Sequence, residues 1–169
     1  MFGKRIILLG NGGSGKSTLA KELGPYLGIE VVHLDVHFWS SGWIQPNKDD
    51  WDKELRKIMQ KESYIMDGNY FRTIAERLTL ADTVVFLDVP RFVSIFRIIK
   101  RRIMYRNVSR PDMAEGCNEQ LDLEFVKWVW NFKKHRRNEI LKMISDSNVE
   151  NKLILSLKDI NELKKKIRE

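Results

Sequence analysis

Short apolar runs alternate with longer segments along this chain. Residues 5–9, 30–34, 63–67, 83–88 and 152–156 are rich in aliphatic and aromatic side chains, as buried strands are. Between them, residues 16–27, 48–61, 90–105, 118–144 and 159–167 have the spacing or flanking residues of helices. The pattern therefore predicts five strands, each followed by helical segments.

This alternation is typical of an α/β fold, in which parallel strands form one sheet and helices cover both of its faces. A chain of 169 residues fits one such domain, spanning residues 1–169. Two segments do not fit the alternation: residues 37–47 are aromatic and turn-rich, and residues 105–117 are polar and basic. Loops of this kind beside a binding site are candidates for a substrate pocket and a lid.

A glycine-rich turn joins the first strand to the first helix. Its sequence, GNGGSGKS, matches the phosphate-binding pattern GxxxxGK[ST]. Backbone N–H groups and the helix dipole converge at such a turn and favour a phosphate group. We expect the nucleotide to be bound by Gly10, Gly12, Gly13, Ser14, Gly15, Lys16, Ser17 and Thr18. Lys16 is expected to reach the β- and γ-phosphates, and Ser17 to bind Mg²⁺.

Composition adds few constraints. No apolar run approaches the roughly 20 residues that span a bilayer, and no signal peptide precedes the first strand, so we expect a cytoplasmic protein without membrane contact. Cys117 is the only cysteine, which excludes an intramolecular disulfide. The net charge of +7 is compatible with a polyanionic partner. The basic run 133–137 can be either the solvated face of a helix or a nucleic-acid contact.

An ordered set of motifs along nearly the whole chain resembles adenylate-kinase-like P-loop kinases, and more closely the DNA topology modulation proteins. The residues that carry the resemblance are Gly10–Thr18, His33-Leu34-Asp35, Phe38-Trp39, Gly42-Trp43, Asp67-Gly68-Asn69-Tyr70, Ala81-Asp82, Phe86-Leu87-Asp88-Val89-Pro90-Arg91, Arg97, Lys100-Arg101, Arg110, Gly116-Cys117, Phe125, Trp128, Trp130 and Phe132.

The resemblance implies a three-layer P-loop fold with strand order 2-3-1-4-5, and transfer of the γ-phosphoryl group of ATP with Mg²⁺. It also implies an acceptor region at about 35–62 and a lid at about 102–118. Arg97 and Arg101 stand at the offsets where these kinases place arginines that grip the transferred phosphate, and Arg110 is expected to join them from the lid. Four residues apart on a helix, Arg97 and Arg101 share one face. From spacing alone, they can equally be solvated.

Two aspartates at predicted strand ends compete for a role at the Mg²⁺ ion. In the related kinases, the residue corresponding to Asp67 holds a water of the metal shell. We prefer Asp67 to Asp88, because Gly68 lets the chain turn sharply at the site, whereas Asp88 leads into Pro90 and a helix start.

The chain departs from adenylate kinase where the acceptor binds. Asn69-Tyr70-Phe71-Arg72 replaces the Phe-Pro-Arg segment whose arginine binds the acceptor phosphate, which argues against AMP. Asp35, expected at the carboxyl end of the second strand, can hydrogen-bond an acceptor hydroxyl. Trp39 and Trp43 can stack on a ring of the acceptor or pack in the core, and the sequence does not decide between these roles.

Two alternatives remain open. His33, Asp35 and His37 alternate and on a strand would share one side, a spacing that can bind a transition metal. The basic lid and the 133–137 run could instead serve a nucleotide-regulated DNA-binding protein, although no DNA-binding motif supports this. The favoured hypothesis is a kinase for a nucleotide, nucleoside or other small acceptor.

Overall fold

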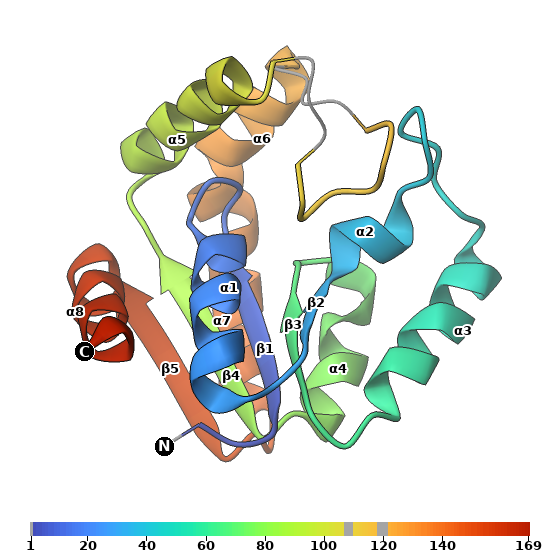
Figure 1. The fold of residues 1–169 in the computed structure, drawn as a ribbon, viewed down its shortest axis with the longest axis vertical. Helices are drawn as coiled ribbons and strands as arrows, with labels where there is room; N and C mark the ends of the chain where they lie inside the picture. The colour runs from blue at the N-terminus through green and yellow to red at the C-terminus, as the bar shows by residue number, and fades with distance from the viewer. Residues whose placement is uncertain (1, 107–109, 118–121) are drawn as a thin grey trace.

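The computed structural model describes residues 2–106, 110–117 and 122–169, and its centre is a parallel β-sheet (Figure 1). The five strands are ordered β2-β3-β1-β4-β5, which confirms the expected order. Their bounds are Arg5–Gly10 (β1), Val31–His33 (β2), Tyr64–Asp67 (β3), Thr83–Asp88 (β4) and Asn151–Ser156 (β5). All five coincide with predicted strands to within about two residues, the usual uncertainty of element ends.

Helices cover both faces of the sheet. They are α1 (Lys16–Leu27), α2 (Leu34–Phe38), α3 (Lys48–Met59), α4 (Ile74–Leu80), α5 (Arg91–Met104), α6 (Leu123–Phe132), α7 (Asn138–Asp146) and α8 (Leu157–Arg168), with a 3₁₀ turn at Phe71–Thr73 and a π-helical segment at Lys133–Arg137. Side chains alternate along β1, so Ile6 and Leu8 pack against α1 and α8, whereas Ile7 and Leu9 pack against α4 and α7. The result is a three-layer α/β fold.

Three elements differ from the sequence prediction. The continuous helix expected at 118–144 is instead α6, the π-helical segment and α7, and residues 118–121 lie outside the described residues. The second predicted strand ends at His33, and Asp35 lies in the first turn of α2. The prediction that His33, Asp35 and His37 share one side of a strand is therefore wrong, because residues on a helix do not alternate between two faces. Helix α4 was missed although Ile74 and Leu78 are spaced for one buried face.

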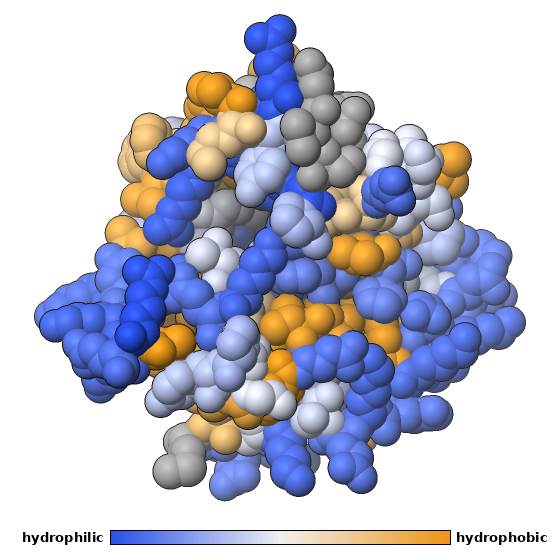
Figure 2. Space-filling view, viewed as in Figure 1, coloured by the Kyte–Doolittle hydropathy of each residue, from blue (hydrophilic) through white to orange (hydrophobic). Residues whose placement is uncertain are grey.

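The carboxyl ends of the strands point toward α5, α6 and α2, which lie beyond this edge of the sheet (Figure 1). Gly13 fixes how closely α5 approaches, since a Cβ atom there would be 2.5 Å from the carbonyl oxygen of Ser94. Helix α5 carries exposed apolar side chains, including Phe92, Phe96 and Ile103. Figure 2 shows apolar residues at the upper left of the molecule, where Figure 1 places this helix. Among the described residues, no helix is both long and apolar enough to cross a membrane.

Candidate functional site

The phosphate loop between β1 and α1 depends on two close contacts. Gly10 and Gly13 have φ angles of 145° and 73°, which L side chains rarely adopt. A Cβ atom at Gly10 would be 2.8 Å from the carbonyl oxygen of Leu87 on β4. A substitution at either position would therefore push the loop away from β4 or α5. These contacts fix the loop at the N-terminus of α1, where anion binding is favoured.

Lys16 is folded back on its own loop. Its Nζ donates to the carbonyl oxygens of Gly10 and Asn11, at 3.0 and 2.9 Å. Burial lowers the pKa of Lys16, and the nearby carboxylates of Asp67 and Asp35 act in the opposite direction. The ammonium group is thus held at the loop, where a phosphate oxygen can replace the two carbonyl groups as its acceptor.

Asparagine side chains hold the start of the loop. The amide of Asn69 makes two hydrogen bonds with Gly10: its Oδ1 accepts from the backbone N–H at 3.1 Å, and its Nδ2 donates to the carbonyl at 2.7 Å. Asn11 Nδ2 donates to the carbonyl of Val129 on α6, at 2.8 Å. The positioning by Asn69 was missed from the sequence, where the only signal was its place directly after Asp67-Gly68.

Asp67 ends β3 beside the loop, because the strand register places it opposite Leu8 of β1 and His33 of β2. Its Oδ2 lies 2.9 Å from His33 Nδ1, and the residue is buried. Asp67 and Ser17 line the same cavity. Oxygen ligands suit Mg²⁺, which typically takes one or two protein carboxylates together with substrate phosphates and water. The described residues hold no cluster of three or more His, Cys, Asp or Glu side chains suited to a metal.

Asp88, the competing aspartate, is held elsewhere. Arg137 Nε donates to both carboxylate oxygens at 3.0 and 3.1 Å, and its Nη2 donates to Oδ2 at 2.6 Å. The Arg137 guanidinium lowers the pKa of Asp88. Asp88 also makes no hydrogen bond as a helix cap and does not line the cavity. Asp67 therefore lines the cavity and Asp88 does not, and a role of Asp67 at Mg²⁺ stays a prediction.

Asp35 lines the same cavity as the phosphate loop and interacts electrostatically with Lys16. Tyr70 donates its hydroxyl proton to Asp35 Oδ1 at 2.6 Å, and the Tyr70 ring packs on Phe38 and Trp51 at centroid distances of 4.6 and 4.9 Å. Burial raises the pKa of Asp35, while the hydrogen bond from Tyr70 lowers it. Asp35 lies near the sheet edge, as the sequence predicted, but a helix presents it.

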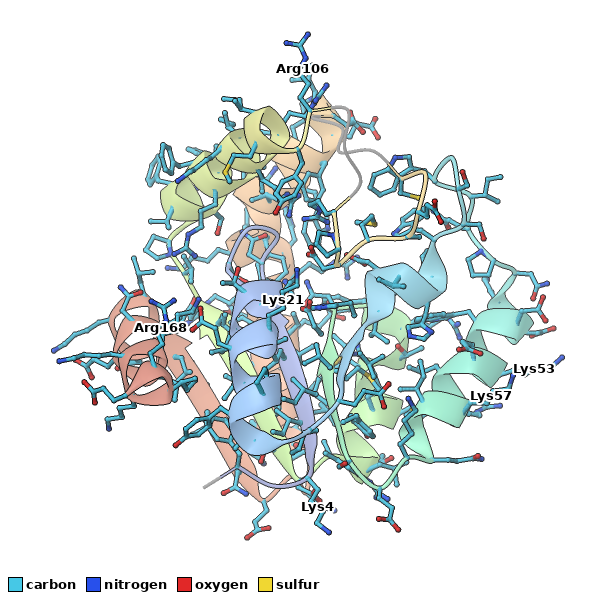
Figure 3. All side chains as sticks on the ribbon, in the orientation of Figure 1. Lys4, Lys21, Lys53, Lys57, Arg106 and Arg168 are labelled. Carbon is cyan, nitrogen blue, oxygen red and sulfur yellow. The ribbon has the colours of Figure 1, made fainter. Side chains whose placement is uncertain are left out.

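The predicted arginines reach the cavity from two directions. Arg97 and Arg101 project from one face of α5, and Arg97 Nη1 donates to the carbonyl of Ser14 at 2.9 Å. Arg110 is buried, 3.7 Å from Asp112, which in turn pairs with Lys21 of α1 at 3.2 Å. By contrast, Arg106 projects away from the molecule at the end of α5 (Figure 3).

The two irregular segments meet each other. The indole rings of Trp39 and Trp43 are 5.3 Å apart and pack against Met113, Ala114 and Cys117. Backbone contact is direct, since Gly42 N–H donates to the carbonyl of Gly116 at 3.3 Å. Both tryptophans also line the cavity. The sequence left open whether these tryptophans line a pocket or pack in the core. In the structure each ring does both, because it packs against residues 110–117 and also borders the cavity. Residues 107–109 and 118 of the expected lid lie outside the described residues.

Together these groups enclose a cavity of about 930 Å³. Its lining includes Lys16, Asp35, Arg97, Arg101 and Arg110, all five of the side chains predicted to be catalytic. Of the predicted nucleotide-binding residues, Gly12 to Thr18 also line it. Gly10 does not, because it lies behind the loop and acts as its anchor.

Comparison with known proteins places the fold. The chain is 28% identical to an adenylate kinase from Pseudothermotoga lettingae, over 69% of this chain and 72% of that protein. A shikimate kinase from Acinetobacter baumannii, solved with shikimate, matches with a TM-score of 0.63 at 17% identity, over 98% of this chain and 90% of that one. A gluconokinase from Sinorhizobium meliloti matches with a TM-score of 0.51 at 14% identity, over 98% and 90%. No family model matches the chain. The sheet order and phosphate loop define the fold as that of the P-loop kinases.

Lys16→Ala should raise the dissociation constant for ATP by tenfold or more without unfolding the protein, because it removes the charge at the phosphate loop and little core packing. Calorimetric titration with ATP measures the loss. The matched control is Lys4→Ala, which removes one positive charge from the opposite end of β1 (Figure 3). Equal ATP affinity in the two variants would disprove the assignment of the loop.

Asp67→Asn should raise the Mg²⁺ concentration required for turnover, whereas Asp88→Asn should not. Asp88→Asn should instead lower the free energy of unfolding by about 1 kcal/mol, because it weakens the bonds with Arg137. Mg²⁺ titration of turnover and urea unfolding measure the two effects. A larger Mg²⁺ defect in Asp88→Asn would reverse the assignment.

Proposed function

We propose that this protein is an ATP- and Mg²⁺-dependent kinase that transfers the γ-phosphoryl group to a hydroxyl group of a small molecule or nucleotide. The observation that carries the proposal is the placement of two oppositely charged groups in one cavity. Lys16 and the phosphate loop line one part of it, and the half-buried carboxylate of Asp35 lines another. A phosphate donor and a hydroxyl acceptor can meet between them.

On the donor side, the loop and Lys16 bind the β- and γ-phosphates, and Ser17 and Asp67 hold Mg²⁺ directly or through water. When bound, the ion neutralises charge on the phosphate oxygens. Arg97, Arg101 and Arg110 supply positive charge where negative charge moves between the leaving and attacking oxygens. The bond between Arg97 and the Ser14 carbonyl supports this role, because it keeps the guanidinium beside the loop.

On the acceptor side, Asp35 accepts a hydrogen bond from the attacking hydroxyl and orients its oxygen toward the γ-phosphorus. Tyr70 occupies Oδ1 of this carboxylate, which directs the acceptor toward Oδ2. Trp39, Trp43 and Met113 provide an apolar wall beside it. This pocket fits an acceptor that combines a hydroxyl group with a ring.

AMP is a poor candidate for the acceptor despite the likeness to an adenylate kinase. Arg72, the arginine after Asp67-Gly68, is exposed and bonded to both carboxylate oxygens of Asp52, at 3.0 and 2.5 Å. It does not line the cavity. An AMP phosphate would therefore have no arginine from this segment.

A role in DNA binding, suggested by the resemblance to DNA topology modulation proteins, has weaker support. Within the basic run, Arg137 pairs with Asp88, and Arg136 pairs with Glu139 while its guanidinium lies 4.4 Å from the centroid of the Phe71 ring. These two cations thus have partners within the fold. Saturable, ATP-dependent binding of duplex DNA at physiological salt would favour the DNA role over the kinase.

Arg97→Ala and Arg101→Ala should each slow phosphoryl transfer far more than they weaken ATP binding. We expect a loss of about 2–4 kcal/mol in transition-state stabilisation, the scale for one preorganised donor at a reacting centre. Single-turnover rates and ATP affinity separate the two effects. Arg106→Ala is the control, because this exposed residue projects away from the cavity (Figure 3). Wild-type transfer rates in both α5 variants would contradict the assignment.

A panel of nucleosides, nucleotides and hydroxylated metabolites, assayed for phosphoryl transfer from ATP, tests the proposed function itself. The true acceptor should also quench fluorescence from Trp39 or Trp43. Trp39→Phe and Trp43→Phe should each remove part of that quenching, whereas Trp130→Phe should not, because Trp130 stacks with Arg91 outside the cavity. Asp35→Asn should abolish acceptor-dependent turnover and spare ATP binding. Undiminished acceptor quenching in both pocket variants would mean that the acceptor binds away from these two rings.

A further inference from the structure

One fully buried cation lies behind the site and has no role in the mechanism above. Arg77, on α4, has 0% exposure. Within the described part of the chain its hydrogen-bond acceptors are backbone carbonyls and the sulfur of Met66, with no carboxylate among them. Burial lowers the pKa of Arg77 to about 10, so the guanidinium remains charged at neutral pH. A buried charge is costly unless every donor finds an acceptor.

Those carbonyls belong mainly to one short segment. Arg77 Nη1 donates to Gly68 at 2.8 Å, and Nη2 donates to Asn69 and, at 3.4 Å, to Tyr70. Nε reaches the carbonyl of Thr73 at 3.4 Å. The planar guanidinium has donors in a fixed fork, so it can hold three successive carbonyls in one arrangement. A lysine at this position could not reproduce that geometry.

The held segment has an unfavourable backbone. Tyr70 has a φ of 38° and Gly68 a φ of 143°, both in the region that L side chains rarely adopt. A non-glycine residue in such a conformation persists only where its surroundings hold it. Arg77 supplies that restraint through the carbonyls.

The same segment contacts both halves of the site. Asn69 holds the backbone of Gly10 at the start of the phosphate loop. Tyr70 donates to Asp35 on the acceptor wall. The backbone on which both side chains stand is therefore fixed by one buried guanidinium.

We propose that Arg77 is a positioning residue that aligns the donor and acceptor halves of the site through residues 68–70. It acts through Asn69 on the phosphate loop and through Tyr70 on Asp35, and it touches neither substrate. This inference rests on the proposed function for its kinetic consequence, but its effect on ATP binding is independent of the acceptor.

The test is Arg77→Lys, which keeps the positive charge but removes the planar set of guanidinium donors. We expect a folded protein whose dissociation constant for ATP rises several-fold and whose turnover falls about 10- to 100-fold, the scale for misplacement by about 1 Å. Arg72→Lys is the matched control, since Arg72 is an exposed arginine five residues away that does not line the cavity. Circular dichroism and urea unfolding establish that each variant folds.

A double-mutant cycle with Asn69→Ala distinguishes positioning from a general structural role. If Arg77 acts through Asn69, Arg77→Lys should change ATP affinity little further in the Asn69→Ala background. Additive losses, or wild-type ATP affinity and turnover in a folded but less stable Arg77→Lys protein, would overturn the proposal.

If Arg77→Lys does not fold, the variants Asn69→Ala and Tyr70→Phe test the two links from residues 68–70 to the phosphate loop and to Asp35. The first should weaken ATP binding, and the second should lower turnover at saturating ATP. Wild-type behaviour of both variants would overturn the proposal. Failure of the wild-type protein to bind ATP or transfer phosphate would instead contradict the proposed function.

Discussion

The site depends on how closely the phosphate loop packs against its neighbours. Only glycine permits the observed approach of Gly10 to the β4 backbone and of Gly13 to the α5 backbone. The second contact seats α5 over the loop, and Arg97 on that helix then reaches the Ser14 carbonyl. One steric constraint therefore places both the phosphate-binding turn and the Arg97 guanidinium beside it.

Charges of both signs line the cavity. Lys16, Arg97 and Arg101 line the same cavity as Asp35 and Asp67, and the two carboxylates partly offset the effect of burial on the pKa of Lys16. Each carboxylate has a hydrogen-bond partner of its own: Tyr70 for Asp35 and His33 for Asp67. Hydrogen bonds of this kind hold each carboxylate in one orientation at the cavity.

Arginine has several different roles in this chain. Arg137 links the segment after α6 to the end of β4, Arg77 organises a loop from inside the core, and Arg97 bonds the phosphate loop. Residue type and local sequence do not distinguish these roles, since Arg77 and Arg97 both directly precede an apolar residue of a helix and yet bond different parts of the chain. The distinction comes from which backbone or carboxylate the folded chain brings within reach.

The sequence by itself predicted the phosphate loop and the five strands, and the family resemblance predicted their order. It also predicted five side chains that line the cavity, namely Lys16, Asp35, Arg97, Arg101 and Arg110. These signals are local: an apolar run reports burial, and a glycine pattern reports a turn. Only the tertiary structure decided that Asp35 stands on a helix, that Asp88 belongs to Arg137, and that Trp39 and Trp43 meet residues 110–117. It also revealed the contact of Asn69 with Gly10 and the buried position of Arg77. The contact of Asn69 with Gly10 joins residues distant in sequence, and it exists because the sheet makes β3 the neighbour of β1, a pairing that periodicity does not encode.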